Sequence, residues 1–167
     1  MLLIVILGTG GAAWADWRAD MPSAQQIGEG DFSWFGIRLY HAQLWSEHMP
    51  FDFDARFVLQ ITYARTIARE RLAASGIDEI ERAASPPLSA DTLERWRDHM
   101  LRAFVDVRPG DRLRAEYLPG KGVRFYAGDR LTAEFDDPAF ARAFFGIWLD
   151  PSTRAPGLRR ALLGEAP

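Results

Sequence analysis

Residues 136–164 have the sequence DDPAFARAFFGIWLDPSTRAPGLRRALLG and combine an apolar helix, a stop signal and a second short helix. Asp137 is placed to accept hydrogen bonds from the first helical turn, and Pro138 suits the first helical position, where a missing N–H costs nothing. Phe140 and Phe144 then lie four residues apart on one helical face. Because exposed aromatic rings are costly, this face predicts a helix that closes the core.

The same stretch also predicts where this helix ends. The sequence Asp150-Pro151 stops it, because the residue before a proline avoids helical geometry. Pro156 then opens a second short helix, which carries Leu158 and Leu162 on one side.

Upstream segments show the periodicities of strands and helices. Residues 25–47 predict two strands that bend at Gly36, and the second has apolar side chains on both faces. Residues 57–63 alternate apolar and polar side chains, which predicts a strand with one buried face. The remaining predicted elements are helices at about 69–83 and from Ser89 or Asp91 to Phe104, strands at 112–118, 123–126 and 131–135, and an irregular or edge segment at 16–24.

The order of these elements indicates the α+β class. Strands, two helices, three strands and two helices predict an antiparallel sheet with helices gathered on one face. The chain has 167 residues, of which 48% are hydrophobic and 13% aromatic, enough for one packed core. We therefore expect a single domain at residues 16–167.

Composition and spacing argue against several classes of function. The net charge of −3 and the scattered arginines argue against a nucleic-acid partner. Cysteine is absent, and His41, His48 and His99 do not have the spacing of a metal site. We expect no metal and no other cofactor.

Two local patterns have simple structural explanations. Gly28-Glu29-Gly30 lacks the third glycine and the following helix of a phosphate-binding loop, so it predicts a strand bulge. The acid pairs Asp52/Asp54 and Asp136/Asp137 fall in a loop and at a helix start, so solvated or capping roles are favoured over catalysis.

Residues 1–15, MLLIVILGTGGAAWA, resemble a signal peptide. An apolar run at 2–7 is followed by small residues and an Ala13-x-Ala15 cleavage pattern. The alternative is a buried first strand. Export to the periplasm or medium is the favoured prediction, and no stable membrane insertion is expected after cleavage, because the run is far shorter than the ~20 residues of a spanning helix.

Four blocks of the chain resemble the bacterial chalcone isomerase-like proteins, in the same order and with matching spacing. The blocks are GEGDFSWFGIRLYHAQLW at 28–45, FVLQITYARTI at 57–67, VDVRPGDRLRAEYLPGKGVRFYAG at 105–128 and FFGIWLDPSTRAPGLRRALLG at 144–164. The resemblance implies the open-faced β-sandwich of chalcone isomerase, in which a ligand cleft lies between a curved sheet and its helices.

The resemblance also implies where catalytic residues would stand. Plant chalcone isomerases position the flavonoid with an Arg soon after a Gly-x-Gly, a Thr on the next strand, and a helical Tyr, Lys and Asn. Here Asp31 to Ser33 follow Gly30, so that Arg is absent, and Arg38 is the nearest guanidinium. Tyr40 lies near the position of the Thr. The corresponding helix, Leu93 to Met100, carries no Tyr, Lys or Asn. No catalytic residue is assigned.

What remains is a set of side chains that could line a cleft. The candidate ligand-binding residues are Arg38, Tyr40, Trp96, His99, Met100 and Phe145. Trp96, Met100 and Phe145 are also explained by simple core packing, and Arg38 by a surface salt bridge.

Three hypotheses follow. The first is an exported, non-catalytic protein that binds a small apolar molecule, such as the fatty acids bound by some plant relatives of this fold. The second is an isomerase, an intramolecular lyase that uses Arg38, Tyr40 and His99. The third is a structural or interaction protein whose cleft is filled by its own side chains. A cavity of ~300 Å³ or more with convergent polar groups would favour either of the first two.

Overall fold

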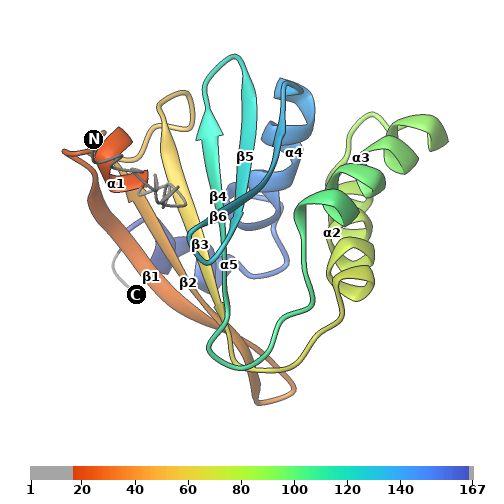
Figure 1. The fold of residues 1–167 in the computed structure, drawn as a ribbon, viewed down its shortest axis with the longest axis horizontal. Coiled ribbons are helices and arrows are strands. Elements are labelled where there is room, and N and C mark those ends of the chain that lie inside the picture. Colours follow the sequence, from red (N-terminus) through yellow and green to blue (C-terminus); the bar gives the residue numbers. More distant parts are fainter. Residues whose placement is uncertain (1–16, 166–167) are drawn as a thin grey trace, which may run out of the picture.

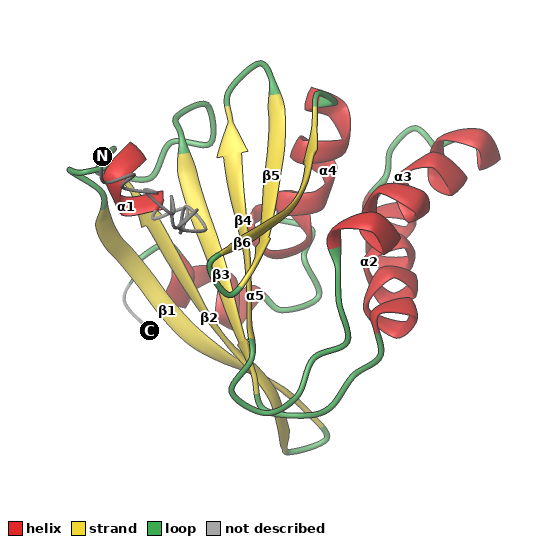
Figure 2. Cartoon of the chain, viewed as in Figure 1, coloured by secondary structure: helices red, strands yellow, loops and turns green. Residues whose placement is uncertain are grey.

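The computed structural model describes residues 17–165 and shows one curved sheet backed by helices (Figures 1 and 2). The sheet has six antiparallel strands in sequence order. The strands are β1 (Gln25–Trp34), β2 (Ile37–Ser46), β3 (Phe57–Tyr63), β4 (Arg112–Leu118), β5 (Gly122–Ala127) and β6 (Arg130–Phe135). The predicted α+β class and open-faced sandwich are confirmed.

Four helices lie on one face of the sheet. They are α2 (Arg69–Ala83), α3 (Ala90–Ala103), α4 (Pro138–Leu149) and α5 (Pro156–Leu162). Helix α4 packs against β5 on one side and α2 on the other, α3 reaches β6, and α5 packs on β1. In Figure 1, α4 stands between the sheet and the α2–α3 pair.

The sheet faces the helices with alternate side chains, as the strand period requires. On β3 these are Phe57, Leu59 and Ile61, each at most 6% exposed. Leu59 pairs with Ala115 of β4, which pairs with Phe125 of β5, so one row of apolar side chains crosses the sheet. The predicted strand at 57–63 and the side that it turns to the helices are confirmed, but its other face is buried too, at Val58 under Trp17 and Met21.

Helix α4 begins and ends where the sequence predicts. The Asp137 carboxylate accepts a hydrogen bond from the Phe140 N–H at 2.9 Å, and Pro138 occupies the first helical position. The helix buries Phe140, Phe144 and Phe145. Ser89, rather than Asp91, caps α3, because its hydroxyl accepts from the Thr92 N–H.

The prediction of an irregular or edge segment at 16–24 is wrong for its first part. Residues Trp17–Asp20 form a single helical turn, α1. Four residues are too few to show the hydrophobic periodicity by which a helix is recognised in a sequence. It lies on the sheet face opposite the other helices, where Trp17 is 3% exposed and packs edge-on against Trp45. The helices are therefore not all on one face, and both faces of β2 are covered near Trp45.

The glycines of Gly28-Glu29-Gly30 serve packing. The β1–β2 register shifts between Gln26 and Gly28, which is the predicted bulge. A side chain at Gly28 would collide with the backbone carbonyl of Ala161 in α5. The glycine thus lets α5 lie directly on β1.

The predicted leader at 1–15 lies outside the described residues. Its cleavage stays a prediction.

Candidate functional site

A small apolar cavity lies between the sheet and α4. Its volume is about 30 Å³. Strands β3, β4 and β5 supply its floor, and Phe144 and Trp148 of α4 supply its roof. The lining residues are Leu59, Ile61, Tyr63, Phe104, Leu113, Arg114, Ala115, Phe125, Phe144 and Trp148.

Aromatic side chains with polar ends gather at one end of this cavity. The Trp148 indole N–H donates to the Tyr40 hydroxyl at 3.0 Å and so joins α4 to β2. The Tyr40 ring stacks on Phe32 at 5.1 Å and meets the edge of Tyr63 at 6.2 Å. Tyr40, Tyr63 and Trp148 therefore place two hydroxyls and one indole beside an apolar space.

Burial determines the protonation of both tyrosines. Loss of water around Tyr40 raises the pKa of its phenol to about 12, and the Trp148 hydrogen bond opposes this only in part. Burial raises the pKa of Tyr63 further. Both phenols are neutral at pH 7, so they can donate a hydrogen bond but not act as a base. Within residues 17–165, no hydrogen bond from the Tyr63 hydroxyl is found.

A larger, open groove of about 350 Å³ lies at the same end of the sheet. Its walls are Val105 and Val107, which follow α3, together with the start of β4 and the β5–β6 turn. Leu113 lines both the groove and the cavity. The groove and the cavity therefore adjoin at Leu113.

Arg38 and Tyr40, both predicted from β2, have different environments. Tyr40 faces the helices. The Arg38 side chain is 60% exposed, and its guanidinium lies 3.6 Å from the Asp31 carboxylate. The Asp31 carboxylate also lies 2.8 Å from the Nδ1 of His41, whose side chain is on the sheet face opposite that of Tyr40. In this structure Arg38 forms a surface ion pair.

Trp96 and His99 of α3 gather around the cap of α4, away from Tyr40. The Trp96 indole N–H donates to Asp137 at 3.1 Å, and the His99 Nε2 lies 3.7 Å from the same carboxylate oxygen. The His99 ring stacks on Phe135 at 4.1 Å. Burial is the main cause that lowers the pKa of His99, and Asp137 opposes it. These side chains tie α3 to α4.

Met100 and Phe145 are core residues. Both are fully buried. Met100 packs against Gly76 of α2, where an added Cβ would lie 2.8 Å from its sulfur. Phe145 meets Phe57 edge-on at 4.8 Å. Of the six predicted residues, only Tyr40 adjoins the apolar cavity, through Trp148 and Tyr63.

None of the six predicted residues is among those that line the cavity, so the sequence prediction missed Tyr63, Phe104 and Trp148 among others. The i, i+4 spacing of Phe144 and Trp148 was a usable signal, because such residues share a helical face. Tyr63 was likewise on the correct face of its predicted strand. Phe104 follows the last turn of α3, where periodicity no longer fixes direction.

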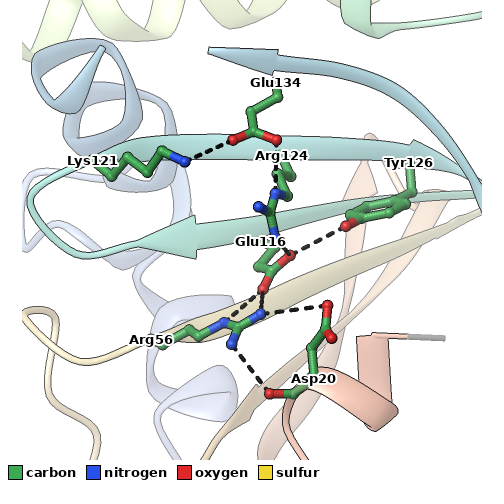
Figure 3. Close-up of polar contacts among 7 residues, drawn as sticks. All are labelled: Asp20, Arg56, Glu116, Lys121, Arg124, Tyr126 and Glu134. Atoms are coloured by element: carbon green, nitrogen blue, oxygen red, sulfur yellow. Dashed lines mark hydrogen bonds and ion pairs between the residues drawn. The ribbon is translucent and has the colours of Figure 1, made fainter. Parts of the chain in front are cut away.

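The opposite sheet face carries a buried polar network (Figure 3). Glu116 of β4 is fully buried, and both Arg56 and Arg124 contact its carboxylate. The Tyr126 hydroxyl donates to it at 3.2 Å. Arg56 also donates to the Asp20 carbonyl at 3.1 Å, so the network holds α1 against the sheet. Because the carboxylate is enclosed and satisfied by these partners, its role is structural.

Residues 17–165 contain neither a metal site nor a membrane-spanning helix. No three His, Asp or Glu side chains there are arranged to hold a metal ion. None of the helices in that range has the length and apolarity needed to span a bilayer.

A curved antiparallel sheet, backed by helices around a small apolar cavity, defines an open-faced α+β sandwich. A family model described as chalcone isomerase-like matches residues 39–164. The chain belongs to the chalcone isomerase-like family.

One protein of similar sequence and one solved structure resemble this chain. An uncharacterized protein of Haemophilus influenzae is 30% identical over 142 residues, which are 84% of this chain and 68% of that protein. The crystal structure of a fatty-acid binding protein of Arabidopsis thaliana superposes with a TM-score of 0.64 at 9% identity, over 85% of this chain and 87% of that one. The second similarity shows a shared fold.

Proposed function

We propose that this protein is an exported, non-catalytic binder of a small, elongated apolar molecule of the fatty-acid kind. The observation that carries the proposal is the apolar cavity between the sheet and α4. It has neutral hydroxyls at one end and an open groove beyond Leu113. The shared fold of a plant fatty-acid binding protein supports the ligand class.

The cavity must widen before it can hold such a ligand. Its volume of about 30 Å³ accommodates roughly one water molecule, whereas ligand sites usually measure ~300 Å³ or more. Rotation of Leu113 and Phe104 would join the cavity to the groove, which already provides about 350 Å³. Binding is therefore coupled to side-chain movement at this end of the sheet.

The chemistry of the lining supports binding rather than catalysis. Ring closure of a chalcone needs a cation and hydroxyls that are organised around a developing negative charge. Arg114 is the one arginine among the residues that line the cavity, but its guanidinium lies on the opposite sheet face, over the rings of Tyr126 and Trp17. There its Nη2 donates to the Gly128 carbonyl and lies 3.9 Å from Asp129. Tyr40 and Tyr63 can orient a polar head group but cannot replace that cation.

The test is ligand binding by purified protein. Native mass spectrometry of the freshly isolated chain should show a co-purified molecule, and titration with palmitate and with palmitamide should show saturable binding of both. Ala115→Leu fills the cavity and should abolish binding. Ala141→Leu overfills a fully buried position elsewhere in the core and should leave binding intact.

Two further substitutions identify the head-group partner. Tyr63→Phe removes a hydrogen-bond donor and should weaken palmitate roughly 2- to 10-fold. Arg38→Ala tests whether Arg38 turns toward the ligand. If this variant loses affinity for palmitate but not for palmitamide, the guanidinium of Arg38 must contact the carboxylate in the cleft. No saturable binding of either ligand would refute the proposal, and chalcone turnover well above the uncatalysed rate would refute its non-catalytic part.

A second candidate function is favoured by the small cavity volume. If the side chains around 30 Å³ never part, the domain is a structural or interaction module with a filled cleft. In that case neither ligand binds, and Ala115→Leu changes only stability.

Export is the part of the proposal that the described residues do not address. It is supported by the apolar run and Ala13-x-Ala15 pattern at residues 1–15. Sequencing the amino terminus of the protein made in its native host should begin at Asp16, and a chain that begins at Met1 would refute it.

A further inference from the structure

The turn between β1 and β2 exposes three large apolar side chains. Phe35 is 89% exposed, Trp34 55% and Ile37 50%. They are consecutive around Gly36 and form a projecting tip, which we call the hairpin tip. In Figure 1 this turn is the lowest point of the molecule and extends past the neighbouring loops. Exposed apolar residues of this size, adjacent to one another, indicate an interaction surface.

The backbone of the tip makes its composition more notable. Phe35 has φ of 48° and Gly36 has φ of 75°, so both central residues of the turn are left-handed. Such turns favour Asn or Asp followed by Gly. A phenylalanine there adopts a strained conformation, and its ring packs edge-on against Trp34 at 5.2 Å while most of it lies in solvent. The Phe35 ring is not part of the hydrophobic core, which implies a role outside the domain.

The shape of the tip fits a lipid bilayer better than a protein partner. A stable protein interface buries about 800 Å² on each side and involves roughly 20–30 residues. The hairpin tip offers three side chains on a convex turn, and its neighbours Ser33 and Arg38 are polar and exposed. Trp favours the boundary between lipid headgroups and hydrocarbon, and Phe is typical of the apolar face of segments that lie in it.

Positive charge lies beside the tip, as anionic headgroups require. The Ala64 N–H donates to the Leu39 carbonyl, which places Arg65 at the same end of the sheet as Arg38. Arg65 is exposed, and within residues 17–165 no carboxylate pairs with it. Asp31 offsets Arg38 in part. An unpaired guanidinium at the same end of the sheet as the aromatic rings matches the chemistry of an anionic lipid surface.

From these observations we propose that the hairpin tip inserts into the headgroup region of an anionic bilayer. In this position the tip brings the same end of the sheet, where Tyr63 and the open groove lie, toward the membrane. The proposal concerns the surface of the domain, so it stands or falls independently of ligand binding in the cavity.

Vesicle binding by the full chain tests this inference. Co-sedimentation should show binding to phosphatidylcholine vesicles that contain phosphatidylglycerol, and weaker binding to phosphatidylcholine alone. Phe35→Ser should lower the partition coefficient at least about tenfold, because transfer of one aromatic ring is worth that much. Met49→Ser is the matched control. Met49 is 58% exposed in the loop at the opposite end of the sheet and should make no difference.

A second measurement locates the contact. Brominated lipids should quench part of the tryptophan fluorescence, and Trp34→Phe should remove that quenched part. Arg65→Ala should weaken binding to the anionic vesicles only.

Three results would overturn the proposal. They are no vesicle binding, an equal loss for Phe35→Ser and Met49→Ser, or lipid-independent self-association that Phe35→Ser abolishes. Each variant is compared within the same full chain. Membrane affinity that comes from the apolar run at 2–7 would therefore survive Phe35→Ser, and such a result would also count against the proposal. If palmitate binding fails while vesicle binding holds, only the proposed ligand function is lost.

Discussion

Replacement of Phe144 by alanine measures how much of the stability depends on the aromatic face of α4. Phe144 is 5% exposed, and its ring centroid lies 5.0 Å from that of Phe125 and 5.3 Å from that of Trp148. It also lines the small cavity. The substitution therefore removes a buried ring and enlarges a space that already exists.

Two contributions set the size of the effect. The transfer of the ring from the core to water is worth ~2 kcal/mol. The removed ring and the existing void together give a cavity on the order of 100 Å³, and at ~24 cal/mol per Å³ this adds ~2 kcal/mol. We expect Phe144→Ala to lower the free energy of unfolding by ~3–5 kcal/mol.

Equilibrium denaturation in guanidinium chloride provides the measurement, with the m-value monitored for a change in the unfolded state. Phe35→Ala is the matched control, because it removes the same ring from a position that is 89% exposed and should change stability by less than ~0.5 kcal/mol. A loss below ~1 kcal/mol for Phe144→Ala, or equal losses for both variants, would show that the ring does not close the core. An enlarged apolar cavity should also bind benzene or xenon.

Three further predictions concern the polar network, the β1–α5 contact and pH. Glu116→Ala should destabilise the fold by ~3–5 kcal/mol in denaturant titration, because Arg56 loses its buried partner, whereas Glu134→Ala at a partly exposed pair should cost under ~1 kcal/mol. Gly28→Ala should lower the melting temperature sharply, since its Cβ meets the Ala161 carbonyl, and Gly157→Ala, which meets nothing, should not. Burial lowers the pKa of His99 below 6.5, so the unfolded chain binds more protons just below that pH. The free energy of unfolding should fall as pH decreases from about 6.5, and His99→Phe should flatten that slope.

The fold was predictable because its elements carry strong local signals. Asp137-Pro138 fixed the start of α4, and the alternation at 57–63 fixed which side of β3 faces the helices, since each signal involves only neighbouring residues. The single turn of α1 was missed, because four residues are too few to show a helical period.

The site was less predictable, because its contacts join distant parts of the chain. The hydrogen bond between Tyr40 and Trp148 spans 108 residues, and no pattern within either element specifies it. Arg38 has the same strand parity as Tyr40, yet its guanidinium lies beside Asp31. The register shift between Phe32 and Ser33 and the twist of a two-stranded ribbon redirect side chains there, and sequence periodicity assumes that neither occurs.

The two faces of the sheet hold different helices, and one end of the sheet carries the loops that lead to the α2–α3 pair. Glu116 and its arginines hold α1 on one face, and the glycine contact at Gly28 fixes α5 on the other, so packing and charge both stabilise this part of the sheet. At the end where β3 leaves the sheet and β4 enters it, the α2–α3 pair joins the sheet through two loops that share the bridge between Ile67 and Val107. An antiparallel meander places the β1–β2 turn at this same end, so the exposed tip, the groove and the cavity lie together where these two loops leave the sheet.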